Sequence, residues 1–234
     1  MLVVEIALDP TVINASPAKS SWIVRAACSL AEAMRLQTSD LLDIEITELN
    51  AGYRLLKGGQ MTYADIYLYD SLSSGAGYST EIAKQIEELL NNVELSLKKC
   101  KCKNACHECI KHYRNRSNHA LLDRLAALEL LEWAKTGKTA WVISIKKQQE
   151  IIKPLIGILG DYEIEVDFPA DKTTINVSPK GSHDNLELKV YPSMLVEPTG
   201  KDIIYVSDFE AKYSRAYSVD RYRAPVAGQN ASPK

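Results

Sequence analysis

The residues best suited to chemistry in this chain are four cysteines that fall within ten positions. Cys100, Cys102, Cys106 and Cys109 follow the order C-x-C-x3-C-x2-C and make up four of the five cysteines present. Thiolate sulfur is a preferred soft ligand of Zn²⁺, and four thiolates complete a tetrahedral shell. A catalytic zinc keeps one position open for water, which four thiolates would fill. The spacing therefore predicts a closed, structural zinc site.

Two other uses of these thiols are open, and both are less favoured. Cys106-x-x-Cys109 could be a redox pair, but a thioredoxin-like motif starts a helix in a βαβ setting without further cysteines nearby. His107 lies between two of the predicted ligands and could replace a cysteine. The fifth cysteine, Cys28, lies in a helical pattern and is expected to be a small buried hydrophobe.

Basic residues crowd around the cysteines and are opposed locally only by Glu108. A Zn²⁺ ion with four thiolates carries a formal charge of about −2, so part of this positive charge balances the site. The surplus could contact a nucleic-acid backbone, and the alternative is a solvated or charge-balancing face. The candidate nucleic-acid contacts are Lys101, Lys103, Lys111, Arg114 and Arg116, with Lys98 and Lys99 beside them.

A second basic segment near the C-terminus interleaves cations with tyrosines, as single-strand binders do. The same spacing fits an amphipathic helix that packs its tyrosines, and this alternative is favoured. The candidate contacts are Lys212, Arg215, Arg221 and Arg223, and the tyrosines are Tyr213, Tyr217 and Tyr222.

Amphipathic elements must position the cysteines. Apolar residues at helical spacing predict helices over 22–34, 82–97 and 121–133, so the cluster joins the last two. Alternation predicts strands at 2–8, 44–47 and 64–70, and the last is expected to be central because it is apolar on both faces. Gly52 and Gly58-Gly59 are expected to be turns.

The Gly/Ser-rich stretch 71–78 separates a strand from a helix. Such a loop can cradle an anion, but it lacks G-x-G-x-x-G and a lysine, so a tight turn that needs small residues is favoured. Gly137-Lys138-Thr139 is not a P-loop, since residue 132 is glutamate and a helix precedes it. We find no ATPase motif and no convincing Ser/His/Asp set, so no enzyme is predicted for this chain.

The pattern changes near Gly137 and predicts three parts. These are a zinc-binding domain over 1–136, a small α/β lobe over 137–225 and a flexible tail over 226–234. In the lobe we expect strands around 141–143, 162–168, 175–177, 186–190 and 203–206. We also expect a helix over 148–159 that either has Pro154 near its first turns or is kinked there. The fold class is α+β, with a mixed sheet, amphipathic helices and a four-cysteine zinc knuckle ahead of the lobe.

The overall composition does not indicate binding to nucleic acid or to a membrane. The net charge is −2 and 46% of the residues are hydrophobic, so any basic surface must be local. The chain has no apolar run of about 18 residues and no signal peptide, so a cytoplasmic, reducing location is expected. There, clustered cysteines favour a metal over disulfides. The strand that begins at Leu2 suggests a chain cut from something larger, or a sheet that a partner completes.

Four segments in order resemble a known family. They are the helix containing Leu30-Ala31-Glu32-Ala33 followed by Asp43-Ile44-Glu45; Tyr69-Asp70-x4-Gly75-Ala76-Gly77; the cysteine cluster; and Tyr113-x-Asn115-x3-His119-x-Leu121-Leu122-Asp123-Arg124. Together, over roughly residues 1 to 135, they look like the zinc-binding C-terminal (MZB) domain of mitomycin-repair-type DEAD/DEAH helicases. The domain also occurs in anti-phage systems such as DISARM and Druantia. The family usually has a double glycine where this chain has Ser74-Gly75.

The resemblance implies a structural zinc and a scaffold beside a helicase motor and its DNA, without catalysis in this domain. The ATPase would lie on a DEAD/DEAH-type helicase in cis or in trans. The expected function is an accessory module that supports DNA binding or complex assembly in bacterial DNA repair or phage defence. The alternative is a pure protein-interaction scaffold without nucleic-acid contact.

Overall fold

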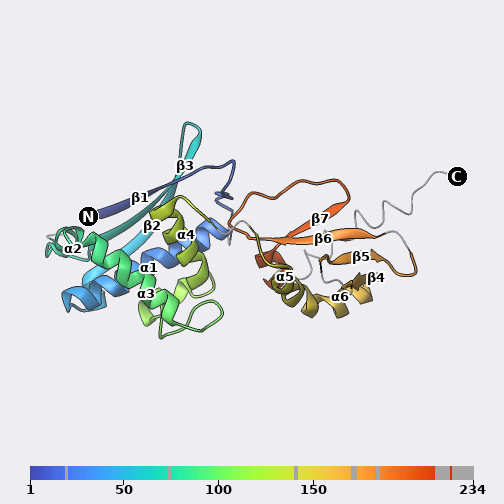
Figure 1. The fold of residues 1–234 in the computed structure, drawn as a ribbon. Coiled ribbons are helices and arrows are strands. Elements are labelled where there is room, and N and C mark those ends of the chain that lie inside the picture. The colour runs from blue at the N-terminus through green and yellow to red at the C-terminus, as the bar shows by residue number, and fades with distance from the viewer. Residues whose placement is uncertain are drawn as a thin grey trace. The chain divides into compact units, whose positions relative to one another are not determined.

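A computed structural model describes residues 1–18, 21–72, 75–139, 142–169, 173–182, 185–213 and Tyr222 (Figure 1). The chain divides into two compact units, Met1–Thr139 and Ala140–Lys234. The sequence predicts this boundary three residues earlier, after residue 136. Both units combine helices with a sheet, which confirms the α+β class. The predicted tail 226–234 lies outside the described residues. No helix in the described part of the chain is both long and apolar enough to cross a membrane.

The first unit contains a three-stranded antiparallel sheet. Its strands are β1 (Leu2–Leu8), β2 (Leu49–Gly58) and β3 (Met61–Asp70), in the order β1-β3-β2. The predicted central position of β3 is confirmed, and Ala64, Ile66 and Leu68 are completely buried on one of its faces. Gly59, at φ 61°, turns the chain from β2 into β3, as its sequence predicts.

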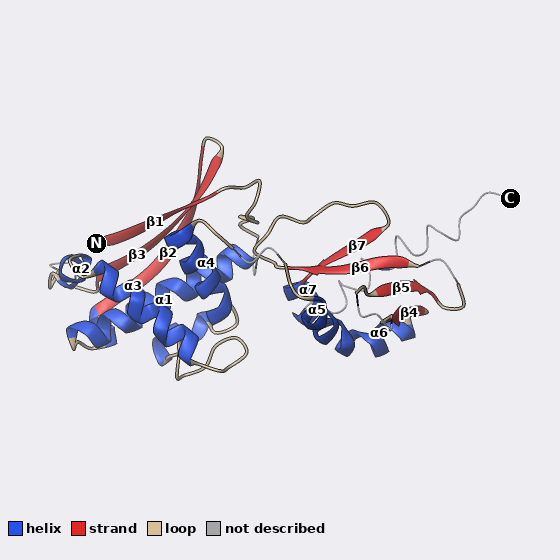
Figure 2. Ribbon diagram, in the orientation of Figure 1, coloured by secondary structure: helices blue, strands red, loops and turns tan. Residues whose placement is uncertain are grey.

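The opposite face of this sheet carries tyrosines and is not covered by the unit's helices, which gather on one side (Figure 2). Tyr63, Tyr67 and Tyr69 alternate with the buried residues of β3, so they share this outer face. Gly52 lies opposite Tyr67 inside β2, so the predicted turn at Gly52 is wrong. A Cβ atom there would lie 2.6 Å from Tyr67 Oη, which explains the glycine.

Helix α1 (Trp22–Leu42) is the central helix of the unit. It packs on β2, β3, α3 (Ile86–Lys99) and α4 (Arg124–Thr136), and most of its residues are buried. The predicted helix over 82–97 is divided into α2 (Tyr78–Ala83) and α3 by a break at Lys84 and Gln85.

The strand predicted at 44–47 is wrong. Asp43 ends α1 in the left-handed conformation, and Ile46–Glu48 form the 3₁₀ helix η1. Arg35 Nη2 donates to the carbonyl of Ile46 at 2.9 Å, which holds this connection against α1. The alternation of Ile44 and Ile46 therefore reflects packing of a short connection rather than strand pairing.

The Tyr69-Asp70-x4-Gly75-Ala76-Gly77 segment is a helix-capping turn. The Asp70 carboxylate accepts from the N–H of Gly77 at 2.6 Å and of Ser79 at 2.9 Å, at the start of α2. Burial acts to raise the pKa of Asp70, but these N–H bonds outweigh it and lower the pKa. Gly75 and Gly77 have φ of 63° and 87°, which glycine adopts readily. Among the described residues of this loop, the N–H groups of Gly75, Gly77 and Ser79 already have partners within the chain, which favours the tight turn over an anion cradle.

The second unit is a four-stranded mixed sheet with helices. Strands β4 (Ile164–Asp167), β5 (Asn176–Pro179), β6 (Leu186–Tyr191) and β7 (Ile203–Ser207) run in sequence order, and only β6 and β7 are parallel. The helical elements are α5 (Ile145–Ile152), η3 (Lys153–Leu155), α6 (Ile156–Asp161) and α7 (Asp208–Tyr213). The predicted interruption at Pro154 is confirmed, since this residue lies in η3.

Two details of this unit differ from the sequence prediction or extend it. The strand predicted at 141–143 is wrong for Val142 and Ile143, which form irregular backbone before α5, while Trp141 lies outside the described residues. The carbonyl of Ile143 instead accepts from Gln148 Nε2 at 2.7 Å, and Gln148 Oε1 accepts from the N–H of Val190 at 2.8 Å. A buried glutamine thus ties this segment to β6.

Candidate zinc centre and the framework around it

The four clustered cysteines are brought together by the loop between α3 and the 3₁₀ helix η2 (Tyr113–Asn118). Their Sγ atoms all lie within 4.8 Å of one another, with separations of 3.5 Å for Cys100–Cys106 and 3.8 Å for Cys102–Cys109 and Cys106–Cys109. A tetrahedron with Zn–S bonds of about 2.3 Å has S···S edges of about 3.8 Å. The donor set and its spacing therefore fit a tetrahedral zinc ion.

The thiols differ in how readily they lose a proton. A hydrogen bond from the backbone of Cys102 is the main cause that lowers the pKa of Cys100 to about 7. Burial is the main cause that raises the pKa of Cys109 to about 12, with Cys102 and Cys106 nearby adding to the effect. Crowding of this kind disfavours several thiolates side by side. Metal binding must therefore release protons, and it becomes tighter as pH rises.

His107 and Cys28 are not part of the cluster. His107 is exposed, and its ring packs edge-on against His119, with ring centroids 5.7 Å apart. Cys28 is buried in α1, where burial raises the pKa of its thiol to about 11. The predicted role of Cys28 as a small buried hydrophobe is confirmed by this environment, because a reactive thiol needs a low pKa and access to solvent.

Arg124 connects the cysteine loop to both flanking helices. Its Nε donates to the carbonyl of Cys102 at 2.8 Å, its Nη1 donates to the carbonyl of Leu97 at 3.0 Å, and its backbone N–H donates to the carbonyl of Asn104 at 2.7 Å. The residue is 9% exposed, and no carboxylate in the described part of the chain pairs with it. A buried cation needs a counter-charge, and four thiolates around zinc supply one. This unpaired arginine is independent support for a negatively charged metal centre.

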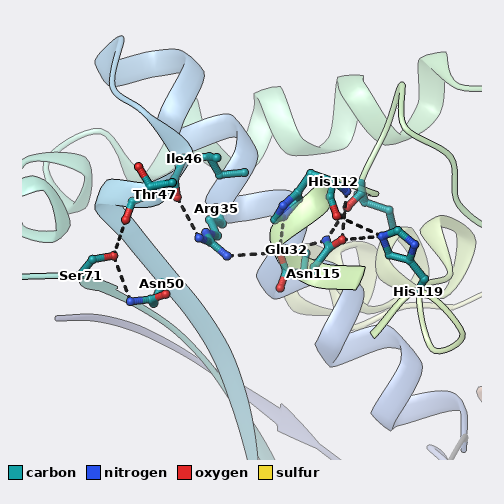
Figure 3. Close-up of polar contacts among 10 residues, drawn as sticks. Glu32, Arg35, Ile46, Thr47, Asn50, Ser71, His112, Asn115 and His119 are labelled. Atoms are coloured by element: carbon teal, nitrogen blue, oxygen red, sulfur yellow. Dashed lines mark hydrogen bonds and ion pairs between the residues drawn. The ribbon is translucent and has the colours of Figure 1, made fainter. Parts of the chain in front are cut away.

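A buried polar network fixes the segment that follows the cysteines (Figure 3). Glu32, on α1, accepts from His112 Nε2 at 2.8 Å and from Asn115 Nδ2 at 3.2 Å. Asn115 Nδ2 also donates to the carbonyl of Ile110 at 2.8 Å, and Asn115 Oδ1 accepts from the N–H of His112 and from His119 Nε2, both at 3.0 Å. Every hydrogen-bonding site of the Asn115 amide is thus used.

The start of α4 is fixed by a second set of contacts with α1. Asp123 Oδ1 accepts from the N–H of Leu125 and Ala126, which caps α4, and Asp123 Oδ2 pairs with Arg25. The backbone N–H of Asp123 donates to Ser29 Oγ at 2.7 Å. Because Asp123 is the cap, α4 begins at Arg124, later than the predicted start at residue 121.

The predicted basic contacts next to the cysteines lie on the surface. Four of them are exposed and Lys111 is half-buried, and in the described part of the chain none forms an ion pair. Lys98 differs, since it pairs with Glu94. The unpaired residues, named here the basic knuckle surface, are Lys101, Lys103, Lys111, Arg114 and Arg116.

The second candidate segment is only partly described. Lys212 pairs with Asp208 at 3.0 Å, and Tyr213 packs on Phe209. Tyr222 is completely buried with the core of the second unit, and burial raises the pKa of its phenol. Its ring is therefore not available for base stacking. Arg215, Tyr217, Arg221 and Arg223 lie outside the described residues.

One surface residue, Tyr113, was named in the resemblance but was not predicted as a nucleic-acid contact. Tyr113 is 82% exposed and stands between Lys111 and Arg114. The same interleaving of aromatic and basic residues singles out residues 212–223. The signal that could have found Tyr113 was therefore present in the sequence.

An open groove of about 720 Å³ runs beside the thiols. Cys100, Cys102 and Cys106 line it together with Lys99 and Lys101, and α3 contributes Asn92, Leu95 and Ser96. Three of the four cysteines therefore border an open groove. A chelator should gain access to the metal from this side without prior unfolding.

Comparison with known proteins identifies the domain. Residues 30–110 match the family model MZB, described as the MrfA Zn-binding domain. This span runs from the middle of α1 to the residue after the last clustered cysteine. The predicted MZB-type domain is therefore confirmed for this part of the chain, and zinc is the metal that both the family and the four thiols indicate.

Two individual proteins are similar over part of the chain. The Druantia protein DruE of Escherichia coli (strain UMEA 4076-1) is 35% identical over 113 residues, which cover 47% of this chain and 6% of that protein. A crystal structure described as the DUF1998 helicase MrfA bound to DNA aligns over 47% of this chain and 14% of that chain, with 12% identity and a TM-score of 0.37. The chain thus corresponds to a small fraction of either protein.

Proposed function

We propose that the first unit is a helicase-associated zinc-binding module that supports DNA binding or complex assembly in bacterial DNA repair or anti-phage defence. The proposal is supported by the MZB match, by the similarity to a Druantia protein and by the thiol geometry. The motor would be a DEAD/DEAH-type helicase, in cis or in trans, and this chain would have no catalytic role of its own.

In this proposal Cys100, Cys102, Cys106 and Cys109 hold one structural zinc ion. When bound, zinc supplies a rigid cross-link between four points of the loop. Arg124 balances its charge and hydrogen-bonds to the end of α3, while Asn115 and Glu32 fix η2 against α1. The residues around the metal thus hold the connection between α3 and α4 in one conformation.

The observation that carries the DNA-contact part is the basic knuckle surface. Five cations without ion-pair partners among the described residues lie on one loop and one short 3₁₀ helix, in a chain whose net charge is −2. Unpaired surface cations next to a rigid centre are suited to phosphates, whose counterions they displace. Two of these cations, Arg114 and Arg116, lie in η2, and the buried hydrogen bonds of Asn115 fix the backbone of this helix.

The test compares DNA binding across salt concentrations. Neutralising Lys101, Lys103, Arg114 and Arg116 to glutamine should weaken binding and lower the steepness of log K against log[salt] by up to about one unit for each lost phosphate contact. Lys57→Gln with Lys138→Gln is the control, since both lysines are exposed and neither belongs to the cysteine loop or to η2. An unchanged salt slope in the four-residue variant, with zinc retained, would rule out DNA contact through this surface.

A protein-interaction scaffold is the second candidate, and the outer face of the first sheet favours it. Val3, Leu56 and Tyr69 are each about 40% exposed on that face. Exposed aliphatic and aromatic residues of this kind suit a protein partner. Under this alternative, neutralising the knuckle cations would leave function intact, whereas a charged residue at Tyr69 would abolish it.

A further inference from the structure

Tyr113 is the most exposed large hydrophobic residue in the described part of the chain, at 82%. It is the first residue of η2 and lies between Lys111 and Arg114, with Arg116 two positions further on. No hydrogen bond or ring contact within the described residues engages its side chain. Within the described residues, a phenol ring with so little contact, beside cations that form no ion pair there, has no evident role in the stability of this unit.

The segment that carries Tyr113 is nevertheless held firmly. His112, the residue before it, bonds to Glu32 through its ring and to Asn115 through its backbone. Asn115, two residues after Tyr113, is 2% exposed and makes four hydrogen bonds. The inner side of η2 is therefore fixed to α1, while Tyr113, Arg114 and Arg116 face solvent. A side chain displayed from a fixed backbone loses less freedom when it binds than one on a mobile loop.

We propose that Tyr113 stacks on an unpaired base and so makes the basic knuckle surface prefer single-stranded over duplex nucleic acid. The inference rests on the proposed function, since it assumes that this surface meets phosphates. Proteins that bind single strands without reading sequence combine cations that follow the backbone with aromatic rings that accept base faces. Here Arg114 and Arg116 are the cations and Tyr113 is the ring.

The same geometry disfavours duplex as the preferred ligand. In a duplex the base faces are covered by neighbouring bases, and a single exposed ring could reach one only by unstacking it. Unstacking costs free energy that a single strand does not require. Stacking is also indifferent to the sugar, so single-stranded DNA and RNA share the chemistry that Tyr113 recognises.

The experiment measures the affinity of the zinc-loaded full chain for a labelled oligo-dT strand of about 12 nucleotides, an oligo-U strand of the same length and a matched duplex. Tyr113→Ala should weaken binding to both single strands by about tenfold and leave duplex binding within about twofold. Tyr113→Phe should bind like the unaltered chain because it keeps the ring. Tyr162→Ala is the control for loss of a half-exposed tyrosine elsewhere.

The salt dependence separates stacking from a loss of charge contacts. Tyr113→Ala should leave the slope of log K against log[salt] unchanged, whereas Arg114→Gln should lower it by about one unit. Equal zinc content and thermal midpoint show that the variant is folded, as expected for a side chain with few contacts. Four results would each overturn the stacking role. Tyr113→Ala could lose affinity for duplex as well, could show a lower salt slope, or could lose no affinity at all. Tyr113→Phe could lose as much affinity as Tyr113→Ala.

The two proposals fail in different ways. If the unaltered chain binds neither single strand nor duplex, the DNA-contact function falls, and the stacking role falls with it. If neutralising the cations reduces binding but Tyr113→Ala does not, only the stacking role falls. If RNA alone responds to Tyr113→Ala, recognition involves the sugar, and the inference in its present form is wrong.

Discussion

Replacing Arg124 by methionine should destabilise the first unit and weaken its hold on zinc. The guanidinium donates to the carbonyls of Cys102 and Leu97, at 2.8 and 3.0 Å, from a position that is 9% exposed. Leu97 lies in the last turn of α3, where carbonyls have no partner within the helix. Methionine keeps much of the volume of the side chain and removes both donors and the charge.

The magnitude follows from three terms. The buried carbonyl of Leu97, left unpaired, costs about 1–3 kcal/mol, and the partly buried carbonyl of Cys102 adds a smaller amount. Loss of a cation at the C-terminus of α3 adds about 0.3–1 kcal/mol. Relief from burying the guanidinium offsets part of this, and we expect a net loss of about 2–4 kcal/mol in the free energy of unfolding. Removal of a group next to a metal ligand typically lowers metal affinity by about 10- to 100-fold.

The stability of the first unit is measured by hydrogen exchange of the amides in α3 and α4 at increasing urea concentrations. The amides of β6 and β7, in the second unit, serve as an internal reference. Zinc affinity is measured by competition with a chelator. Arg116→Met is the matched control, since Arg116 is exposed and forms no ion pair within the described residues. If Arg124→Met and Arg116→Met had equal unfolding free energies and equal zinc affinities, Arg124 would not act as the link between metal and helices.

Three further predictions concern the framework. Asn115→Ala should lower the free energy of unfolding by about 2–4 kcal/mol, because it leaves several buried groups unpaired. Asn118→Ala, at the half-buried end of η2, is the control and should lower it much less in the same urea experiment. Gly52→Ala should cost about 1–2 kcal/mol, because its Cβ meets the Tyr67 ring, and the cost should vanish in a Tyr67→Ala background; a cost that persists there would point to backbone strain instead. Burial lowers the pKa of His112 below its ordinary value of 6.5, despite the opposing effect of Glu32. The unfolded chain therefore takes up this proton first, and stability should fall as pH drops below about 6.5, by at most about 1.4 kcal/mol per pH unit. Urea unfolding at several pH values should show a shallower fall in His112→Gln, and identical slopes would exclude His112 as a source of the acid sensitivity.

The sequence could predict what depends on local chemistry. Four thiols within ten residues fit few sites other than a metal centre, and their Sγ atoms converge as that reasoning requires. The central position of β3 was predicted because both faces of its sequence looked apolar, although one face carries tyrosines that the unit's helices leave uncovered. The 3.6-residue period of Ile82, Leu89, Val93 and Leu97 marked their common buried face, although it could not show the break at Lys84 and Gln85.

Long-range polar contacts could not be predicted in the same way. Glu32 lies 80 residues before His112, and Arg25 lies 98 residues before Asp123, so no local pattern joins them. The resemblance had marked Asn115 and Arg124 without giving them roles, and the structure shows that both fix backbone around the cysteines. The false strand at 44–47 has a related cause, because two alternating isoleucines fit a 3₁₀ connection held by Arg35 equally well.

The central claim is that Cys100, Cys102, Cys106 and Cys109 hold one zinc ion that shapes the connection between α3 and α4. Native mass spectrometry of the purified chain tests it most directly, with Cys106→Ser as the variant and Cys28→Ser as the matched control. We expect one zinc per chain in the unaltered protein and in Cys28→Ser, and loss of zinc with faster amide exchange in α3 and η2 in Cys106→Ser. Zinc retained in Cys106→Ser, or absent from the unaltered chain, would contradict the claim.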